Sequence, residues 1–490
     1  MGFFKDLIIA FRTGGHDSGG WDRQNQNWAP VNGTGEQVNT ISRDIIRARA
    51  RDLERNADNV GAVIEAYERN VVGNGILLQA KIKDSEDEDS EENDRLNNVI
   101  EALWEEWCEA ENCDITGQFE FHEIQNMAVR RRLVDGGLFV ISTYDYSQHF
   151  PLKLQMKEVD ELDTSILSYT FRGATNKVVS GIELNRYGKP IAYHFKEYDT
   201  YGWTGKSIRI AADHAKFINY KTRPSDIREL SPLSKILTRL KDVNQYMEAV
   251  SVKERVMACL AVFIKKVNGG GVSFGNPKAE QIDTGTGYKA KRLSPGMIER
   301  LDAGDDIEVV NPSGQASNAK DFIMTMLRSM SSAIGLSYEA VSRDLSQVNY
   351  SSARQNLLED RGTYQLWQKY IIKHLCVPVY KEFVTTCVLS GLLDIPDFFT
   401  NKRKYTACAF IAKGLSWIDP IKEVKANEIA INSNQTTLAE VCAERGRDYK
   451  DVLKQRAKEK KLIEKYGLKG EAENGKTQAN NRKPANAAND

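Results

Sequence analysis

Two amphipathic helices flank a glycine-rich segment, and this order constrains the fold more than any other feature of the chain. Ser231 and Pro232 form a helix start, because proline fits the first helical turn, where its missing N–H is not needed. Apolar residues then recur at three- and four-residue steps, which predicts a helix of roughly 40 Å. A second helix is expected over residues 319–334, ending at Gly335. The glycine-rich residues 263–316 between them are expected to form a small β-containing segment.

A polar connection follows the second helix and leads into a third. Its small polar residues favour a turn, and either Ser351 or Ser352 can cap the helix that follows, because a short hydroxyl satisfies an unpaired N–H. A polar connection of about ten residues between long helices is a poor core element and suits a lumen or a contact surface. The third helix is expected to kink at Pro378. Its apolar stripe, expected in the core, is Leu357, Leu358, Tyr364, Trp367, Ile371, Leu375 and Val379.

The N-terminal part begins with an apolar run and then becomes helical. Residues 1–40 are expected to form a docking arm, in which this run precedes a Gly- and Asn-rich stretch. From Ile41 the pattern predicts a helix capped by Ser42, with Ile45 and its apolar neighbours on one face and arginines on a solvated face. The apolar residues of the arm are Phe3, Phe4, Leu7, Ile8 and Phe11.

Three further segments of the chain differ in composition, and each composition predicts a different kind of structure. Residues 138–223 alternate polar and apolar positions and predict β-structure, with a turn at residues 188–190. The acidic block at residues 84–94 is expected to be a solvated loop, and its alternative role is to repel DNA or recruit a basic partner. The tail from Lys469 lacks an apolar period and is expected to be disordered.

Three local patterns imitate functional sites, and each fails in its context. Gly-Lys-Ser at residues 205–207 ends like a phosphate-binding loop, but Thr200 stands where the first glycine is needed. Residues 271–275 match a nucleophile elbow, but loop rather than helix follows the serine. A cysteine and histidine cluster lacks a second matching ligand pair, so burial is favoured over metal binding. We therefore expect no catalytic residue, metal or cofactor. The cluster is Cys108, Cys113 and His122.

The charge balance limits how the chain can handle nucleic acid. The 490 residues carry 67 lysines and arginines against 68 aspartates and glutamates, a formal net charge of -1. A protein that clamps DNA by neutralising phosphates should be basic, so this chain would touch DNA through local patches or let it pass. Seven scattered cysteines indicate a reducing compartment without a disulfide framework. No segment approaches the roughly 18 consecutive apolar residues of a membrane span.

Several strings, taken together, resemble the portal proteins of lambda-like tailed phages. They span residues 41–468 in order, and the N-terminal arm and the tail lie outside the resemblance. The chain departs from the family in the stretch RPSDIRELSPL, where the family tends to carry Gln and Gly and this chain has Ile227 and Glu229. The family's detailed contacts in this stretch are therefore not assumed for this chain. The strings are RARARDLERN with VVGNGI, GIELNRYGKPIAYHF, VNYSSAR, WIDPIKEVKA and ERGRDYKDVLKQRAKE.

The resemblance implies an α+β portal fold, with a mostly helical stem and crown and small β-rich wing and clip segments. In that fold a clip lies between two stem helices, which matches the order described above. The implied segments are a partly flexible arm (1–40), a wing (41–230), a stem helix (231–262), the clip (263–316), a second stem helix (317–336), a tunnel loop (337–351), a long kinked wing and tunnel helix (352–400), crown-type helices (401–468) and a tail (469–490).

The resemblance also implies a function without catalysis. The chain would form a ring, usually a dodecamer, at one capsid vertex of the virion, after assembly in the bacterial cytoplasm. Double-stranded DNA would be packaged and ejected through it. The implied partners are further copies of the chain, the terminase large subunit, a head–tail adaptor and the major capsid or scaffold protein, with no membrane. The implied site residues are Arg343, Asp344, Gln347, Asn349 and Tyr350 in the tunnel loop, Lys235, Arg239 and Lys253 in the stem, and Lys265, Lys266, Lys291, Arg292 and Arg300 in the partner-docking clip.

Two other functions remain open at this point. A non-channel helical scaffold or adaptor of a capsid assembly would form small or open oligomers rather than closed rings. An enzyme acting on DNA would need clustered carboxylates on a rigid element to hold metal ions. The acidic block at residues 84–94 is instead a run that suits a solvated loop.

Overall fold

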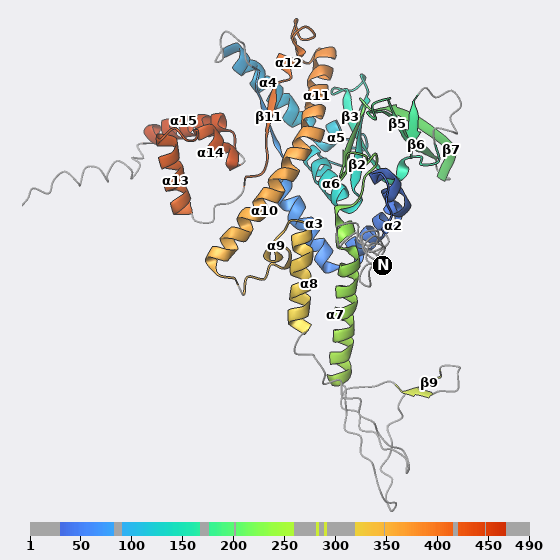
Figure 1. Ribbon diagram of the computed structural model, residues 1–490. Helices are drawn as coiled ribbons and strands as arrows, with labels where there is room; N and C mark the ends of the chain where they lie inside the picture. The colour runs from blue at the N-terminus through green and yellow to red at the C-terminus, as the bar shows by residue number, and fades with distance from the viewer. Residues whose placement is uncertain are drawn as a thin grey trace, which may run out of the picture. The chain divides into compact units, whose positions relative to one another are not determined.

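The computed structural model has the mixed helical and antiparallel β-composition expected of the α+β class (Figure 1). The chain divides into two compact units. The first comprises Met1–Arg51, Ile64–Pro232 and Arg361–Asp490, and the second comprises Asp52–Val63 and Leu233–Asp360. The residues that the structure describes are 30–82, 91–166, 176–199, 202–258, 281–283, 289–291, 319–346, 348–414, 420–445 and 447–466.

Two antiparallel sheets of the first unit lie in the range for which alternation predicted β-structure. The three-stranded sheet has the order β3-β2-β8, and the four-stranded sheet has the order β4-β5-β6-β7. Gly188, with a φ of 81°, makes the turn between β5 and β6 where glycine was expected. The strands are β2 (Gly137–Tyr144), β3 (Leu152–Glu158), β4 (Lys177–Val179), β5 (Ile182–Leu184), β6 (Pro190–Asp199), β7 (Gly202–Ala211) and β8 (Ala215–Asn219).

These two sheets share one apolar core. Phe139 of β2 stacks on Phe217 of β8, with ring centroids 4.1 Å apart, and meets Phe195 of β6 edge-on at 5.0 Å. Because side chains alternate across a strand, one face of each sheet supplies these residues. Burial of each such side chain contributes about 1.5–3 kcal/mol, so this core sets the pairing of the sheets.

A second core, rich in aromatic side chains, joins helices of the first unit. Trp104 lies 4.9 Å from Trp107 and 5.2 Å from Phe383, measured between ring centroids. Trp107 is fully buried, and its Nε1 donates to the carbonyl oxygen of Leu152 at 2.9 Å, which ties α4 to β3. The elements around this core are α4 (Glu91–Trp107), α5 (Ala110–Cys113), α6 (Phe121–Val134), α11 (Val377–Leu389), α12 (Lys402–Tyr405) and the antiparallel pair β1 (Leu77–Ala80) and β11 (Cys408–Ile411).

The long helix after the polar connection is interrupted just before Pro378, as expected. Helix α10 (Tyr350–Ile371) passes into a π-helical turn, η5 (Ile372–Cys376), and α11 then begins. Proline has no N–H to donate to the preceding turn, and the wider π-turn lets the chain continue as a helix.

The expected burial of the stripe on this helix is wrong over its first turns. Tyr364 and the later members are buried, but Leu357 and Leu358 are 39% and 44% exposed. Helical periodicity fixes which side chains share a face. It does not fix how far along the helix a neighbouring element covers that face.

Helix α14 begins with a capping box, which the spacing of Thr437 and Glu440 in the sequence predicts. Thr437 Oγ1 accepts the N–H of Glu440 at 3.2 Å, and Glu440 Oε2 accepts the N–H of Thr437 at 3.1 Å. The sequence also predicts helix C-caps at Gly446 and Gly467, and both residues lie outside the described part of the structure. The helices are α13 (Pro420–Asn432), α14 (Leu438–Glu444) and α15 (Tyr449–Lys465).

Helix α2 (Gly35–Asn56) starts earlier than predicted, so Ser42 lies inside it and does not cap it. The start is made by Thr34 and Gln37. Gln37 N donates to Thr34 Oγ1 at 3.4 Å, and Thr34 N donates to Gln37 Oε1 at 3.1 Å. This reciprocal pattern has a sequence signal, Thr-x-x-Gln, which the surrounding glycines obscure. Helix α3 (Asp58–Val71) follows after a short break.

Two arginines of α2 are buried and two of its isoleucines are exposed, which overturns the prediction of a solvated arginine face over this part of the helix. Arg43 and Arg47 are 4% and 6% exposed, whereas Ile41 and Ile45 are 74% and 53% exposed. The reason is that carboxylates occupy the surface beneath the helix, and arginine is the side chain that pairs with them best.

Glu229 is the centre of this charge network and is fully buried. Its Oε1 accepts from Arg228 Nη2 at 2.7 Å and from Arg47 Nη1 at 3.2 Å, and its carbonyl oxygen accepts from Arg43 Nε at 3.0 Å. A buried carboxylate is tolerated only when it is paired and hydrogen-bonded. The outer ion pairs of the network are Arg51–Asp135 at 2.7 Å, Arg51–Asp160 at 2.6 Å and Arg47–Asp160 at 2.7 Å.

Glu36 ties the start of α2 to the same corner. Its Oε1 accepts from Arg43 at 2.7 Å, and its Oε2 accepts the backbone N–H groups of Ile227 and Arg228, each at 3.0 Å. Burial alone would raise the pKa of Glu36. The backbone donors and the Arg43 charge outweigh burial and lower the pKa below its ordinary 4.5.

Glu36→Gln is expected to destabilise the protein at pH 7 by about 2–3 kcal/mol, because it removes charge-assisted hydrogen bonds from a buried site. A lowered folded-state pKa means that the carboxylate stabilises the fold above its ordinary pKa of 4.5. That contribution is lost as the pH falls through the folded-state pKa. Thermal unfolding from pH 7 to pH 3 should therefore show a smaller acid-induced loss of stability in Glu36→Gln than in the wild type.

Asp94→Asn is the matched control, because the Asp94–Lys450 pair is exposed at the surface, and its stability should stay within about 0.5 kcal/mol of the wild type. Equal, small effects of the two variants would contradict an anchoring role for Glu36.

A buried lysine joins β8 to α11. Lys216 is 7% exposed, and its Nζ lies 2.5 Å from Glu382 Oε2, which also accepts from Ser142 Oγ at 2.5 Å. Burial lowers the pKa of Lys216, and the charge of Glu382 opposes this effect. Since both charges are largely removed from water, their attraction mainly offsets a desolvation penalty.

Lys216→Met alone is expected to destabilise the protein by about 3–5 kcal/mol, because Glu382 is left without a cation. The double variant Lys216→Met/Glu382→Leu should recover most of that loss. Chemical denaturation of the two single variants and the double variant measures the coupling. Additive losses would show that the two side chains do not depend on each other.

Candidate functional site

The second unit contains the two helices expected as the stem. Helix α7 (Leu237–Ala258) follows one 3₁₀ turn, η3 (Pro232–Lys235), and α8 (Ala319–Ala333) packs beside it (Figure 1). Tyr246 and Phe322 meet between them with ring centroids 4.9 Å apart. Helix α8 ends at Gly335, whose φ of 80° lies in the region that favours glycine. Both helices therefore occur where periodicity placed them.

Two of the three predicted stem cations, Arg239 and Lys253, lie on one side of α7 by their spacing, and Lys235 ends the 3₁₀ turn before it. Lys235 is exposed and Lys253 is half-buried. Arg239 Nη1 donates to Ser329 Oγ of α8 at 3.0 Å. The side of α7 that carries Arg239 therefore faces α8, and this side chain joins the two helices.

The polar connection is shorter than predicted, because α9 (Tyr338–Ser342) forms inside it. Arg343 ends α9 in the left-handed conformation, with a φ of 56°, which costs a non-glycine residue some strain. Asp344 Oδ1 then accepts the N–H of Ser346 at 3.0 Å. Hydrogen bonds from the Ser346 side chain and backbone lower the pKa of Asp344. Arg343 and Leu345 are both exposed, so this segment presents its side chains to solvent.

Asn349, rather than Ser351 or Ser352, caps α10. Its Oδ1 accepts the N–H of Ser352 at 2.9 Å, and both serines lie inside the helix. The serine prediction is wrong because the helix begins before those residues, at a position where asparagine is an equally good cap. Gln347 and the side chain of Tyr350, two further predicted channel residues, lie outside the described part of the structure.

Two side-chain contacts hold α9 to α10. Ser337, which caps α9, donates its N–H and its hydroxyl to the carboxylate of Asp360, both at 2.6 Å. Asn356 Nδ2 donates to Glu339 Oε2 at 2.9 Å. Asp360 is 3% exposed, and burial raises its pKa against the opposing effect of the Ser337 hydrogen bonds. The connection 343–349 is therefore fixed at both ends.

Sequence reasoning missed Asp360, the residue that fixes this connection. Its partner Ser337 lies 23 residues earlier in the chain, and no spacing rule joins the two. The only signal was a lone carboxylate beside the exposed stretch of the third helix, and such a residue is most often solvated.

The predicted partner-docking segment is largely outside the described residues. Within it the structure gives β9 (Gln281–Asp283) and β10 (Lys289–Lys291), which pair antiparallel. Lys291 is thereby placed at the end of β10, where it pairs with Gln281. The predictions for Lys265, Lys266, Arg292 and Arg300, and the rejected motif at residues 271–275, fall on residues that the structure does not describe.

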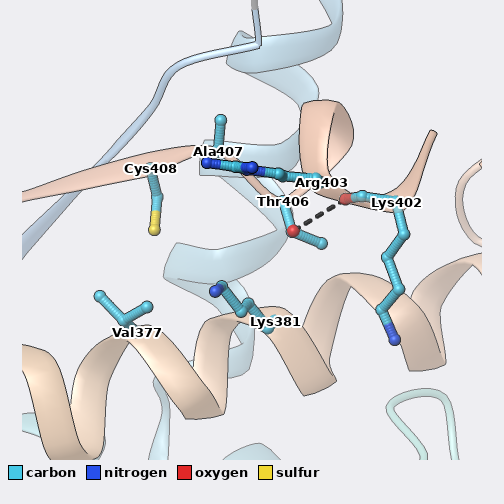
Figure 2. A pocket seen from close by; sticks show the side chains of 7 residues that line it. All are labelled: Val377, Lys381, Lys402, Arg403, Thr406, Ala407 and Cys408. Atoms are coloured by element: carbon cyan, nitrogen blue, oxygen red, sulfur yellow. Dashed lines mark hydrogen bonds between the residues drawn. The ribbon is translucent and has the colours of Figure 1, made fainter.

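A pocket of about 590 Å³ lies in the first unit, between α11, α12 and the start of β11. Figure 2 shows three cationic side chains around it, Lys381, Lys402 and Arg403. None of the three forms an ion pair with another described residue. Burial raises the pKa of the Cys408 thiol, which also lines the pocket, to about 11, with Lys381 opposing that effect. The pocket therefore offers positive charge to an anionic group, and its thiol is protonated and unreactive at neutral pH.

The remaining local patterns occupy ordinary structural positions. Residues 205–207 lie within strand β7, where they cannot open a helix around a phosphate. Cys113 is buried, and its Sγ contacts the carbonyl oxygens of Cys108 at 3.5 Å and Phe119 at 3.4 Å. Over the described ranges, no group of three or more His, Cys, Asp or Glu side chains is arranged to hold a metal ion. In the same ranges no helix combines the length and apolarity that a membrane crossing requires.

Asn349→Ala is expected to destabilise the start of α10 by about 1 kcal/mol, because the first turn loses its cap. Asn349→Asp should leave it nearly unchanged, since a carboxylate accepts the same hydrogen bond. Amide hydrogen exchange at residues 352–356 measures the effect. Ser351→Ala is the control, and exchange that rose as much in this variant as in Asn349→Ala would contradict the cap assignment.

Sequence comparisons identify relatives that align with most of this chain. The family described as "Phage portal protein, lambda family" matches residues 21–368. The "Probable portal protein" of Halomonas phage phiHAP-1 is 24% identical over 456 residues, which cover 91% of this chain and 86% of that protein. "Portal protein B" of Escherichia phage lambda is 23% identical over 489 residues, which cover 93% of this chain and 91% of that protein.

Among solved structures, a chain from the "Neck of native GTA particle computed with C12 symmetry" aligns with a TM-score of 0.38 and 12% identity, covering 74% of this chain and 93% of that chain. The family match extends over most of the sequence. The chain therefore belongs to the lambda family of phage portal proteins.

Proposed function

We propose that copies of this chain close into a ring at one vertex of a phage capsid, and that double-stranded DNA is packaged and ejected through the ring. Membership of the portal family supports this role. The observation that carries the proposal is the connection at residues 343–349. Arg343, Leu345 and Asn349 of this connection are exposed. The connection is fixed at one end by Ser337 with Asp360 and at the other by Asn349. A channel wall needs this combination, because its side chains must meet DNA at a defined position.

The charges of the connection suit passage better than binding. Arg343 and Asp344 place opposite charges side by side, so the segment is not a continuous cationic surface. Each phosphate that a protein neutralises strengthens binding in a salt-dependent way, and a retained contact would resist sliding. The formal net charge of -1 for the whole chain agrees with a channel that does not clamp the duplex.

The remaining partners of the proposed ring follow from the family. We propose that the clip, residues 263–316, carries the surface for the terminase large subunit and later for a head–tail adaptor, through Lys265, Lys266, Lys291, Arg292 and Arg300. A ring also requires heterologous contacts between copies, in which different surfaces of one chain meet. The proposed location is the portal vertex of the virion, in contact with the capsid or scaffold protein.

Purified protein is expected to form closed rings with a central opening, as measured by negative-stain microscopy and by the mass of the intact assembly. Small or open oligomers would favour a non-channel scaffold or adaptor instead. Metal-dependent cleavage of plasmid DNA would favour the enzymatic alternative.

The channel role is tested with Arg343→Gly, because glycine adopts the left-handed backbone of this position without strain while the charge is removed. Ring formation should be unchanged, and DNA packaging or retention in assembled particles should fall several-fold. Asn349→Asp, which keeps the helix cap but adds a negative charge, should also reduce packaging.

Lys241→Ala removes an exposed cation from α7, outside the predicted channel residues, and should leave packaging unchanged. Normal packaging and retention in both Arg343→Gly and Asn349→Asp would show that this connection does not meet DNA.

A further inference from the structure

Helix α2 presents an apolar stripe to solvent, on the side opposite its buried arginines. Val38, Ile41, Ile45 and Ala48 recur at three- and four-residue steps and so share one side of the helix. Ile41 is 74% exposed and Ile45 is 53% exposed, Ala48 is exposed, and Val38 is half-buried. These four residues are called the outer stripe below. Such a contiguous apolar surface is usually kept for a partner.

The charge network prevents α2 from turning this stripe inward. Rotation of the helix by half a turn would remove Arg47 from the buried carboxylate of Glu229 and Arg51 from that of Asp135. It would also turn Glu36 away from the backbone donors of Ile227 and Arg228. The loss of these buried charge-assisted contacts costs more than burial of the apolar side chains would gain. The ion pairs therefore determine the orientation of α2, and the outer stripe remains exposed to solvent.

The chain carries an apolar run close to the outer stripe in the sequence. It ends at Phe11, and α2 begins at Gly35. A random coil of about 23 residues would have a root-mean-square span of roughly 25–30 Å, and the stripe begins within the first turn of α2. Tethering at this length raises the effective concentration of the run at the stripe to about the millimolar range. The run is Phe3, Phe4, Leu7, Ile8 and Phe11, which recur at helical spacing.

We propose that residues 3–11 dock on the outer stripe of α2 in the same chain and cover Ile41 and Ile45. The arm thereby becomes the apolar cover that the folded first unit lacks on this side. The inference does not depend on the channel, because it concerns one chain and its own N-terminus. The same apolar run could reach the stripe of a neighbouring copy, and the experiment distinguishes the two sources.

Disulfide trapping in the full-length chain tests the proposal. Leu7→Cys with Ile45→Cys should form an intramolecular disulfide under mild oxidation, roughly tenfold faster than Lys5→Cys with Ile45→Cys, since Lys5 lies on the polar side of the run. Non-reducing electrophoresis and the intact mass separate a disulfide within one chain from one between chains. Equal rates for the two pairs would overturn the proposal, and disulfides only between chains would assign the stripe to a neighbour's arm.

A second measurement avoids introduced cysteines. Trypsin should cleave at Lys5 and Arg12 slowly in the wild type and roughly tenfold faster in Ile45→Glu, because a charge on the stripe releases the arm. Val99→Glu places the same charge at an exposed apolar residue of a different helix, α4, and should leave the rate unchanged. Equal cleavage rates in the wild type and Ile45→Glu would overturn the proposal. Both experiments give the same answer whether or not the protein forms rings, so they fail or succeed separately from the proposed function.

Discussion

The buried carboxylate of Glu229 sets how the first unit is put together at its N-terminal helix. A fully buried negative charge must be paired, and Arg47 of α2 and Arg228 pair with this carboxylate. Arg43 of α2 donates to the backbone carbonyl oxygen of Glu229. Next to Glu229, the backbone at Gly136 packs directly against the backbone at Leu230. A Cβ at Gly136, where φ is 89°, would lie 2.5 Å from the carbonyl carbon of Leu230, so only glycine fits. The charge network and this close approach together fix the segment that leads to Pro232, where the chain leaves the first unit.

The contacts of Glu229 also explain why the sequence predicted the positions of helices and strands but not which face of α2 is buried. Periodicity predicted α8 and the strands around Phe139, and the proline itself predicted a change in the third helix at Pro378, because each of these signals is local. Periodicity assigned the arginine face of α2 to solvent, because charged faces usually are solvated. The partner that overturns this assignment, Glu229, lies 182 residues away from Arg47 in the chain. Glu229 was visible only as a departure from the portal family, with no indication of what it contacts.

The polar connection was recognised from the same kind of local signal, and its supports were not. Small polar residues between two helices predicted an exposed segment, and residues 343–349 are such a segment. The residues that hold it, Ser337 and Asp360, belong to two different helices and give no local pattern. The cap residue was misassigned by a few positions, because Asn349 and the nearby serines are chemically similar candidates. Exposure of a segment is thus easier to predict than the contacts that make it rigid.

The π-helical turn at Ile372–Cys376 sets which side chains of α11 face the core, because its number of residues determines how far α11 is rotated about its axis. Successive residues of a helix are rotated by about 100°, and a π-turn accommodates one residue more than an α-turn. Deletion of a single residue here would swing Phe383 away from Trp104 and Glu382 away from Lys216 together. The aromatic core and the buried ion pair therefore require the same rotation of α11 about its axis. Insertions or deletions in this stretch are tolerated only when they leave that rotation unchanged.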